Sequence, residues 1–407
     1  MTKKLQQWFI LLIPISLVFS IFAADLLVLI TSVIFLISQI VNKKYKIFLN
    51  KYFVFFFIFW IYLILNSILS YDVELSLSRS IPYIRFGLFF ILLGYYLYDT
   101  DFRNRFFNFV ILILFIICID GIFQYFFGYN LLGYESKHVS RISSFFYEEL
   151  VLGRYLLSFY PLFLISLYYL KNNKIISNLF VQIILLSLYS FTIYLSGERT
   201  AFFNYLLFNL ILLFIFFNKN NLKKLVIFTA IFSFLVLIST IFNKNTFERY
   251  LTIKNIFQTD KIVTFTKFHE KHYLTAYKIF EANKLFGSGI KTFRHICKKP
   301  EYKPEGCATH PHNIFMQFLS ELGLIGLFFY VFAFIYFVSR LLKLFIRKVT
   351  NKVYKNEIYA ESILVVAIIV TLWPFSPSGN FFNNWLSILS ILPLGLLVFF
   401  ENKKSKS

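Results

Sequence analysis

Long apolar runs separated by short polar breaks recur along the whole chain, and they constrain its fold more than any other feature. Of the 407 residues, 58% are hydrophobic and 15% are charged, whereas soluble globular proteins have roughly 45–50% apolar and about 25% charged residues. Apolar runs of about 18 or more residues are long enough to cross a bilayer as α-helices. We therefore predict an all-α, polytopic membrane protein in which residues 1–407 form a single integral membrane domain.

About twelve transmembrane helices follow when the apolar runs are set against the polar breaks. The expected spans are 8–23, 25–41, 52–70, 80–97, 106–127, 149–170, 178–195, 200–217, 222–242, 313–339, 358–373 and 382–400. Lys3, Lys4 and the small residues before Asp25 also resemble a secretory signal. Because a second apolar run follows at once, an uncleaved helical hairpin is favoured.

Basic residues gather in alternate connections between the expected spans. The net charge is +21, and its Lys and Arg residues recur at 42–51, 98–105, 171–174, 218–224, 340–355 and in the C-terminal tail. Short loops rich in Lys and Arg stay in the cytoplasm, so both termini are predicted to be cytoplasmic. This pattern accounts for the positive charge as membrane anchoring, and no nucleic-acid partner is expected.

One outer connection is much longer than the others. Residues 243–312 form a predicted periplasmic loop of mixed polarity, and loops of this length usually carry function. Within it, the apolar spacing of Leu274, Tyr277, Ile279, Phe280 and Leu285 indicates an amphipathic helix that lies against the bilayer or caps the bundle.

Two of the three cysteines lie in this outer loop. Cys297 and Cys307 are ten positions apart, and an oxidising compartment favours a disulfide between them over two free thiols. Cys118 lies in an apolar run and is expected to be a buried, unreactive thiol. No Cys or Cys/His spacing typical of a zinc site is present.

Charged residues form four clusters on the predicted outer side. Charges near the membrane are costly, so these residues are candidates for function. They are Arg79 and Arg85; Arg141, Glu148, Glu149 and Arg154; Glu198 and Arg199; and Arg249 with Arg294. Arginines at helix ends can also reach lipid headgroups, which is the favoured interpretation of Arg79 and Arg154. Arg199 lies in a very short turn with little freedom to reach away. Together the four clusters indicate an anion site, because guanidinium groups bind phosphate oxygens in a bidentate manner.

The stretch "THPHNIFMQFLSELGLIG", residues 309–326, places two histidines before an apolar helix. Pro311 restricts the backbone locally, and Asn313 suits a helix N-cap. His312 should therefore occupy a defined place on the outer face, where a neutral imidazole can accept a proton. A metal site is disfavoured, because two histidines separated by proline, without nearby Cys or carboxylate ligands, make a poor zinc site.

These residues resemble the signature of the O-antigen ligase and O-antigen polymerase superfamily. The signature is His-Asn, nine residues and Gly-x-x-Gly, which corresponds to His312, Asn313, Gly323 and Gly326. Three upstream segments are also similar to the family: "KIFEANKLFGSGIKTFR", "SGERTAFF" and "RISSFFYEELVLG". By motif the resemblance covers roughly 140–330, and by topology it covers the whole chain.

The resemblance implies an inverting, metal-independent glycosyl transfer at the periplasmic face of the bacterial inner membrane. The donor would be a glycan on undecaprenyl pyrophosphate, and the acceptor would be either lipid A core (ligase) or another lipid-linked glycan (polymerase). No cofactor is implied. His312 matches the catalytic histidine and Arg199 the pyrophosphate-binding arginine.

The family's second arginine has no clear match here. Lys271 and His272 occupy its region, and Arg294 follows it. We expect Arg141 and Arg294 to assist Arg199, and the supporting residues are expected to be Glu149, Glu198, His272, His310 and Asn313. The alternative function is a multi-pass transporter or flippase for an anionic or lipid-linked substrate, although no internal repeat supports it.

Overall fold

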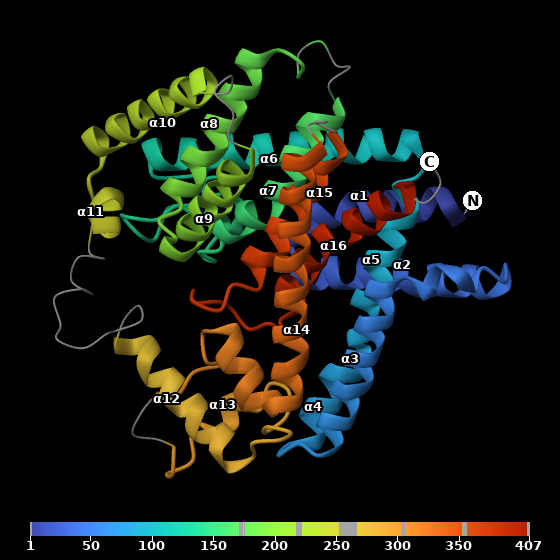
Figure 1. Ribbon diagram of the computed structural model, residues 1–407. Helices are drawn as coiled ribbons and strands as arrows, with labels where there is room; N and C mark the ends of the chain where they lie inside the picture. The colour runs from blue at the N-terminus through green and yellow to red at the C-terminus, as the bar shows by residue number, and fades with distance from the viewer. Residues whose placement is uncertain are drawn as a thin grey trace.

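The structure is a computed structural model in which α-helices account for nearly all regular structure (Figure 1). It describes residues 2–170, 174, 176–216, 222–251, 267–302, 306–351 and 356–404. The only β pairings in these ranges are two isolated bridges. The α-helices are α1 (Thr2–Phe19), α2 (Ile21–Val41), α3 (Lys51–Ile68), α4 (Val73–Ser80), α5 (Ile84–Tyr96), α6 (Thr100–Phe127), α7 (Leu152–Tyr169), α8 (Leu179–Leu195), α9 (Arg199–Phe216), α10 (Leu222–Phe242), α11 (Asn245–Leu251), α12 (Lys267–Ala282), α13 (Phe293–Ile296), α14 (Ile314–Asn351), α15 (Asn356–Thr371) and α16 (Asn384–Lys404). Short 3-10 helices cover Tyr45–Leu49, Ile81–Tyr83 and Ser144–Phe146.

Within the described residues, eight helical segments are long and apolar enough to cross a membrane. They are Ile21–Val41, Lys51–Ile68, Val73–Tyr96, Thr100–Phe127, Arg199–Phe216, Leu222–Phe242, Ile314–Thr350 and Asn384–Glu401. The apolar helices α8 and α15 are shorter, and the expected spans 8–23 and 149–170 fall in α1 and α7. The protein is therefore a multi-pass membrane protein with eight candidate spans, while the count of twelve stays a prediction.

Helix capping moves two of the predicted boundaries. The helix expected to begin at residue 80 instead begins at Val73, because the Asp72 side chain accepts a hydrogen bond from Leu75 N at 3.0 Å. Likewise α6 begins at Thr100 rather than 106, because Asp99 accepts a hydrogen bond from Phe102 N at 3.1 Å. Both caps satisfy backbone N–H groups that have no partner within the helix.

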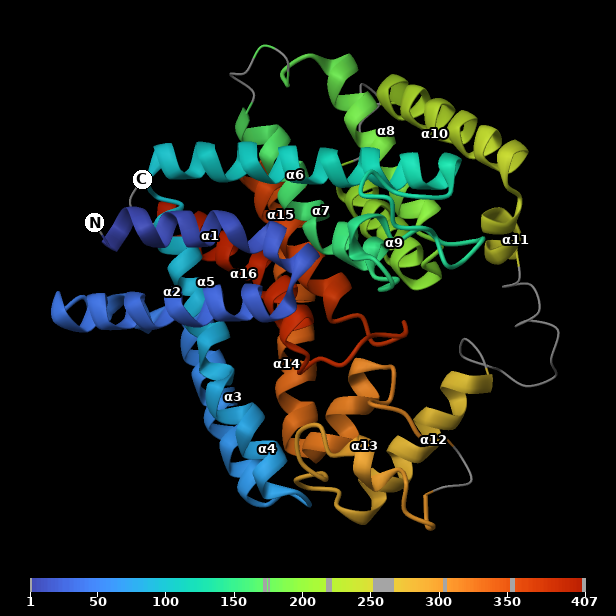
Figure 2. The ribbon, with the colours of Figure 1, turned by 180° about the vertical axis from the view of Figure 1, so that it is seen from behind.

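Ion pairs join the basic connections at one end of the bundle. They are Lys3 with Asp99 (3.0 Å), Lys51 with Glu401 (2.8 Å), and Arg340 with Glu361 and Glu401. Figures 1 and 2 show both chain termini on this same side of the molecule. The basic connections that these ion pairs join thus lie together. Residues 171–173 and 218–221, in two other basic connections, lie outside the described residues. The side of the membrane that the connections face stays a prediction.

Other contacts gather the predicted outer segments. Arg85 Nε lies 2.8 Å from Asp25 Oδ1, and Asn384 Nδ2 donates to Asp25 Oδ2 at 2.9 Å. These contacts join the α1–α2 turn, the start of α5 and the start of α16. Arg85 therefore has a structural partner, so we no longer assign it to the anion site.

Helix α14 is longer than the predicted 313–339 and is broken at Gly323, where φ is 63° and ψ is −162°. A segment of the outer loop fills the break. Four backbone hydrogen bonds join this loop segment to α14. They run from Ser288 N to Ser320 O (3.0 Å), Gly289 N to Glu321 O (2.8 Å), Leu324 N to Lys284 O (2.8 Å) and Ile325 N to Leu285 O (3.4 Å). Backbone groups released by the kink are thereby paired, as buried groups require. These hydrogen bonds fix residues 284–289 to the helix that begins beside His312.

The outer loop forms its own small core at the lower end of α14 in Figures 1 and 2. Ala276 and Ile279 of α12 pack with Phe293, Ile296 and Cys297. The structure joins Cys297 to Cys307 in a disulfide with a Cα–Cα distance of 5.1 Å. The amphipathic helix expected from the spacing of Leu274 to Leu285 begins at Lys267 and ends at Ala282. Its exposed face carries Leu274 (45%) and Tyr277 (47%), so these two predicted apolar positions point away from this core.

Candidate functional site

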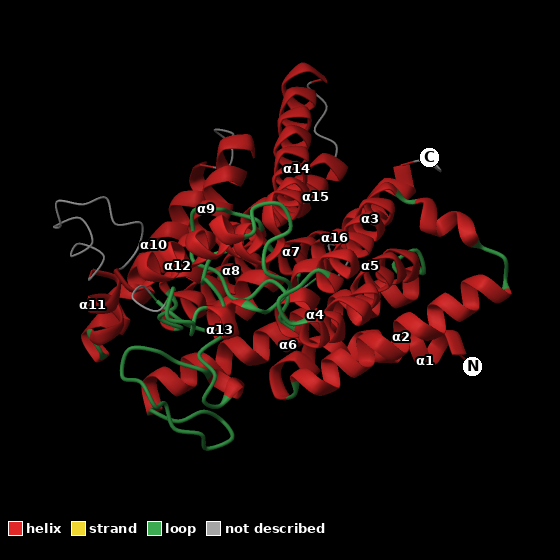
Figure 3. Ribbon diagram, turned by 90° about the horizontal axis from the view of Figure 1, so that it is seen from below, coloured by secondary structure: helices red, strands yellow, loops and turns green. Residues whose placement is uncertain are grey.

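A cavity of about 1160 Å³ opens among the predicted outer segments. Its walls come from the α1–α2 turn, the segment before α7, the start of α9, the outer loop and the connection before α16. Figure 3, seen from below, shows helices joined by loops on this side. The cavity brings together seven residues singled out from the sequence: Arg141, Glu149, Arg154, Glu198, Arg294, His310 and His312.

His312 lies in the wall of this cavity with a left-handed backbone, φ 59°. Residues other than glycine rarely adopt this conformation, and such strain clusters at functional sites. The carbonyl of His312 accepts a hydrogen bond from Ser378 N at 2.8 Å. Next in the chain, Asn313 accepts a hydrogen bond from Met316 N at 3.0 Å and donates to Pro374 O at 2.8 Å. The backbone of His312 is therefore held between a helix N-terminus and the connection before α16.

Three other histidines surround His312. Ring centroids lie 4.2 Å away for His310, 5.3 Å for His272 and 5.7 Å for His269. His310 Nε2 lies 3.2 Å from the Ser378 carbonyl, which fixes its ring. Within the described residues no group of three or more His, Cys, Asp or Glu side chains is arranged to hold a metal ion.

Burial and mutual repulsion keep these imidazoles neutral. Burial, followed by the charges of His310, His272 and His269, lowers the pKa of His312 to about 3. Burial likewise lowers the pKa of His310 to about 4. A neutral imidazole is the form that can accept a proton.

Cationic side chains occupy another part of the cavity wall. The Nε atoms of Arg141, Arg154 and Arg294 are buried and have no hydrogen-bond partner within the described residues. Burial, the largest effect, lowers the pKa of Arg141, against the raising effect of Glu198. Buried donors without partners are costly, and phosphate oxygens would satisfy them.

Arg199 lies beside the cavity, at the N-terminus of α9. Glu198, Thr200 and Ala201 on either side of it line the cavity. The charge of Arg199 acts on Arg141, Arg249 and His269, lowering the pKa of Arg249 and of His269 after burial, which is the larger cause for both. It therefore belongs to the same cationic region as Arg141.

Lys291 is a cation of the site that the sequence analysis did not identify. It lines the cavity and has a left-handed backbone, φ 61°. Burial, then the charges of Arg79 and Arg294, lowers the pKa of Lys291 to about 8. The segment "GSGIKTFR" contains it, and its lysine and arginine three positions apart were the available signal.

The two expected supporting carboxylates differ in environment. Glu198 Oε1 accepts a hydrogen bond from Gly153 N at 2.7 Å, and burial raises the pKa of Glu198 to about 7. Glu149 is exposed at the cavity wall. Glu198 thus holds the first turn of α7, which carries Arg154, whereas Glu149 is open to solvent.

Gln317 links the helix behind His312 to the connection before α16. Its side chain donates to Glu321 Oε2 at 2.8 Å and to Asn380 Oδ1 at 3.0 Å, and accepts from Phe381 N at 2.9 Å. The sequence analysis missed the contribution of residues 374–386 to the site. The polar run "SPSGNFFNN" was the available signal.

One protein family matches part of the chain. Residues 184–331 match the O-antigen ligase family. This segment, 148 of the 407 residues, is similar to O-antigen ligases. It runs from α8 into α14 and contains Arg199, Lys291, Arg294 and all four clustered histidines, whereas Arg141 and Arg154 precede it.

The match confirms the resemblance stated from the sequence. No curated protein matches the chain. The individual site residues therefore rest on the geometry of the cavity.

Proposed function

We propose that this protein transfers a glycan from undecaprenyl pyrophosphate at the periplasmic face of the bacterial inner membrane, in the assembly of O-antigen or a similar surface polysaccharide. The observation that carries the proposal is the shared cavity, which holds neutral histidines and buried cations in one space. The domain assignment supports glycan transfer. The charge pattern supports an orientation with both termini in the cytoplasm.

The cations would hold the donor's pyrophosphate. Arg141, Arg294 and Lys291 line the space, and Arg199 lies beside it. As the bond between the anomeric carbon and the phosphate oxygen breaks, negative charge grows on the leaving pyrophosphate. Fixed cations stabilise charge that develops in the transition state, and no metal ion is needed for that role.

His312 would activate the acceptor. Its neutral imidazole takes the proton of the acceptor hydroxyl as that oxygen attacks the anomeric carbon from the side opposite the pyrophosphate, which inverts the configuration. With no donor bound, the low pKa of His312 makes its imidazole a weak base. A bound pyrophosphate would raise this pKa, since a nearby negative charge favours the imidazolium. The base therefore strengthens when the donor is in place. General-base assistance of this kind contributes about 10²–10⁴-fold.

The acceptor is either lipid A core or another lipid-linked glycan, so both ligase and polymerase activity fit the proposal. The cavity gives room for a lipid-bound donor and an acceptor, being larger than the roughly 300–1,000 Å³ of usual ligand pockets. The lack of a clear match for the family's second arginine slightly favours a polymerase.

Donor binding tests the assignment of the cations. Arg199→Lys and Arg294→Lys keep the charge but lose the bidentate fork, so donor affinity should fall by about tenfold or more while protein yield holds. Arg105→Lys is the matched control, because Arg105 is exposed at the opposite end of the bundle. Affinity would be measured with the lipid-linked donor in nanodiscs. Unchanged donor affinity in both site variants would remove these arginines from the proposed mechanism.

A further inference from the structure

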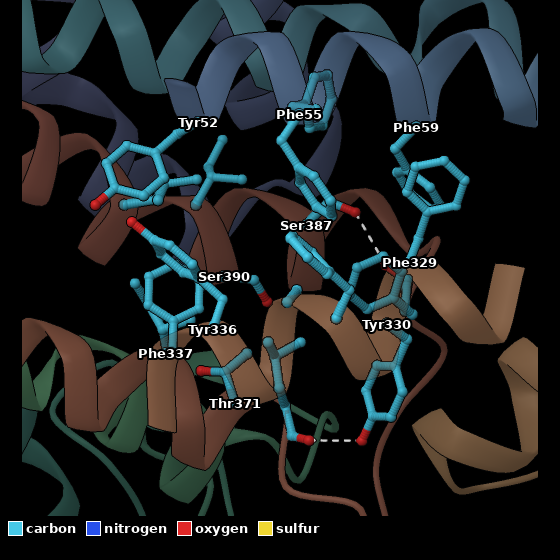
Figure 4. A pocket seen from close by; sticks show the side chains of 18 of the residues that line it. Tyr52, Phe55, Phe59, Phe329, Tyr330, Tyr336, Phe337, Thr371, Ser387 and Ser390 are labelled. Atoms are coloured by element: carbon cyan, nitrogen blue, oxygen red, sulfur yellow. Dashed lines mark hydrogen bonds between the residues drawn. The ribbon is translucent and has the colours of Figure 1, made fainter. Parts of the chain in front are cut away.

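A second cavity lies between helices, and its lining is apolar, unlike that of the cavity that holds the histidines. It measures about 370 Å³ and is lined by side chains of α3, α14, α15 and α16 (Figure 4). Aromatic rings dominate its walls, among them Tyr52, Phe55, Phe59, Phe329 and Phe337. Its volume falls within the roughly 300–1,000 Å³ range of ligand pockets.

The hydroxyl groups in this groove are already used by the protein. Tyr330 Oη donates to Leu372 O at 2.6 Å, Ser390 Oγ to Leu386 O at 2.7 Å and Thr371 Oγ1 to Ala367 O at 2.8 Å. The surface that remains is hydrocarbon and aromatic. A polar ligand would lose its own hydration there without compensation, whereas a hydrocarbon chain would not.

A basic cavity of about 290 Å³ adjoins one end of the groove, and Lys51 and Tyr336 line both. The basic cavity is also lined by Arg340, Lys343 and Arg347, with Glu361 and Glu401 as its only carboxylates. Arg340 and Lys51 are tied to these carboxylates. Lys343 and Arg347 form no ion pair within the described part of the chain and are exposed, so they leave positive charge for a ligand.

We propose that this joined pair of cavities binds an anionic phospholipid, with one acyl chain in the aromatic groove and its phosphate beside Lys343 and Arg347. A basic pocket between membrane helices that opens beside an apolar groove matches the two ends of such a lipid. The site lies at the end of the bundle predicted to be cytoplasmic. Arg347 follows His312 by 35 residues, and the part of α14 between them is about 50 Å long. This site is therefore distinct from the polar cavity, and the proposal does not depend on glycan transfer.

Photocrosslinking of the full-length protein tests this site. The protein is reconstituted in phosphatidylethanolamine vesicles that contain a photoreactive phosphatidylglycerol, and the labelled peptides are mapped. The labelled peptides should come from α3 and α14, around the groove. In Lys343→Gln/Arg347→Gln it should fall by about tenfold, since each basic group near an anionic headgroup contributes substantially. Lys43→Gln/Lys44→Gln, which neutralises two exposed lysines outside the cavities, is the matched control and should label like the wild type.

A second variant blocks the groove without changing charge. Ala333 lines it, so Ala333→Phe should reduce labelling while the protein elutes as the wild type does. Equal labelling by a phosphatidylethanolamine probe, or equal loss in the lysine control, would overturn the proposal. Stronger labelling by a photoreactive polyprenyl phosphate would also overturn it and assign the groove to a carrier lipid.

Discussion

Replacing Gly323 by alanine tests whether the break in α14 is fixed by close backbone contact. A Cβ at this position would lie 2.5 Å from Leu285 O and 2.6 Å from Gly287 N. The backbone conformation alone is one that only glycine adopts readily, at a cost of about 1–3 kcal/mol. Separation of the two segments would also weaken the hydrogen bonds to Ser320 O and Glu321 O, at about 1 kcal/mol each. We expect Gly323→Ala to lower the free energy of unfolding by about 3–5 kcal/mol in total.

Gly128→Ala is the matched control for this prediction. Gly128 caps α6 with φ 83°, also in the left-handed region, but a Cβ there meets nothing within 4 Å. Its cost should be only the conformational one, about 1–2 kcal/mol. Both variants would be unfolded by denaturant in mixed micelles and followed by tryptophan fluorescence. Equal losses of stability in the two variants would refute the argument that the outer loop is locked into the kink.

Two further predictions follow from the site and the outer loop. Lys291, whose pKa is lowered to about 8, is charged below that pH and neutral above it, so kcat/KM for the lipid-linked donor should drop by about tenfold as pH rises through about 8. Lys291→Arg should remove this drop, and a profile unchanged by that substitution would exclude Lys291 as the titrating group. Cys297→Ser/Cys307→Ser should lower the free energy of unfolding by about 2–3 kcal/mol and expose two fewer residues to thiol labelling after reduction. Stability equal to that of the wild type would show that the disulfide does not hold the loop.

The sequence predicted the helical class, because it depends on local composition, whereas the orientation of the basic connections stays a prediction. Apolar length decides whether a segment can span a bilayer, and basic connections lie on one side. Boundaries were less predictable where a cap decided them: Asp72 and Asp99 each start a helix earlier than hydropathy alone indicates.

Of the candidate site, the sequence identified the residues with unusual chemistry in unusual places. His312, Arg141 and Arg294 carry groups that are costly near a membrane, so each stood out individually. The sequence could not show that Lys291 joins these residues. Its position depends on the backbone hydrogen bonds between residues 284–289 and the kink at Gly323. Such hydrogen bonds link segments distant in sequence, and no local pattern records them.

The central claim is that His312 accepts the acceptor's proton in the cavity that holds the donor, and one measurement tests it most directly. Purified His312→Ala and His310→Ala proteins would be reconstituted in liposomes with lipid-linked glycan donor and acceptor, and the initial rate of glycan transfer would be compared with that of the wild type. Donor binding would be measured on the same preparations. We expect His312→Ala to lose about 10²–10⁴-fold in rate while it still binds donor, and His310→Ala to lose less, because its ring is held at the Ser378 carbonyl. Transfer by His312→Ala at the wild-type rate would contradict the mechanism.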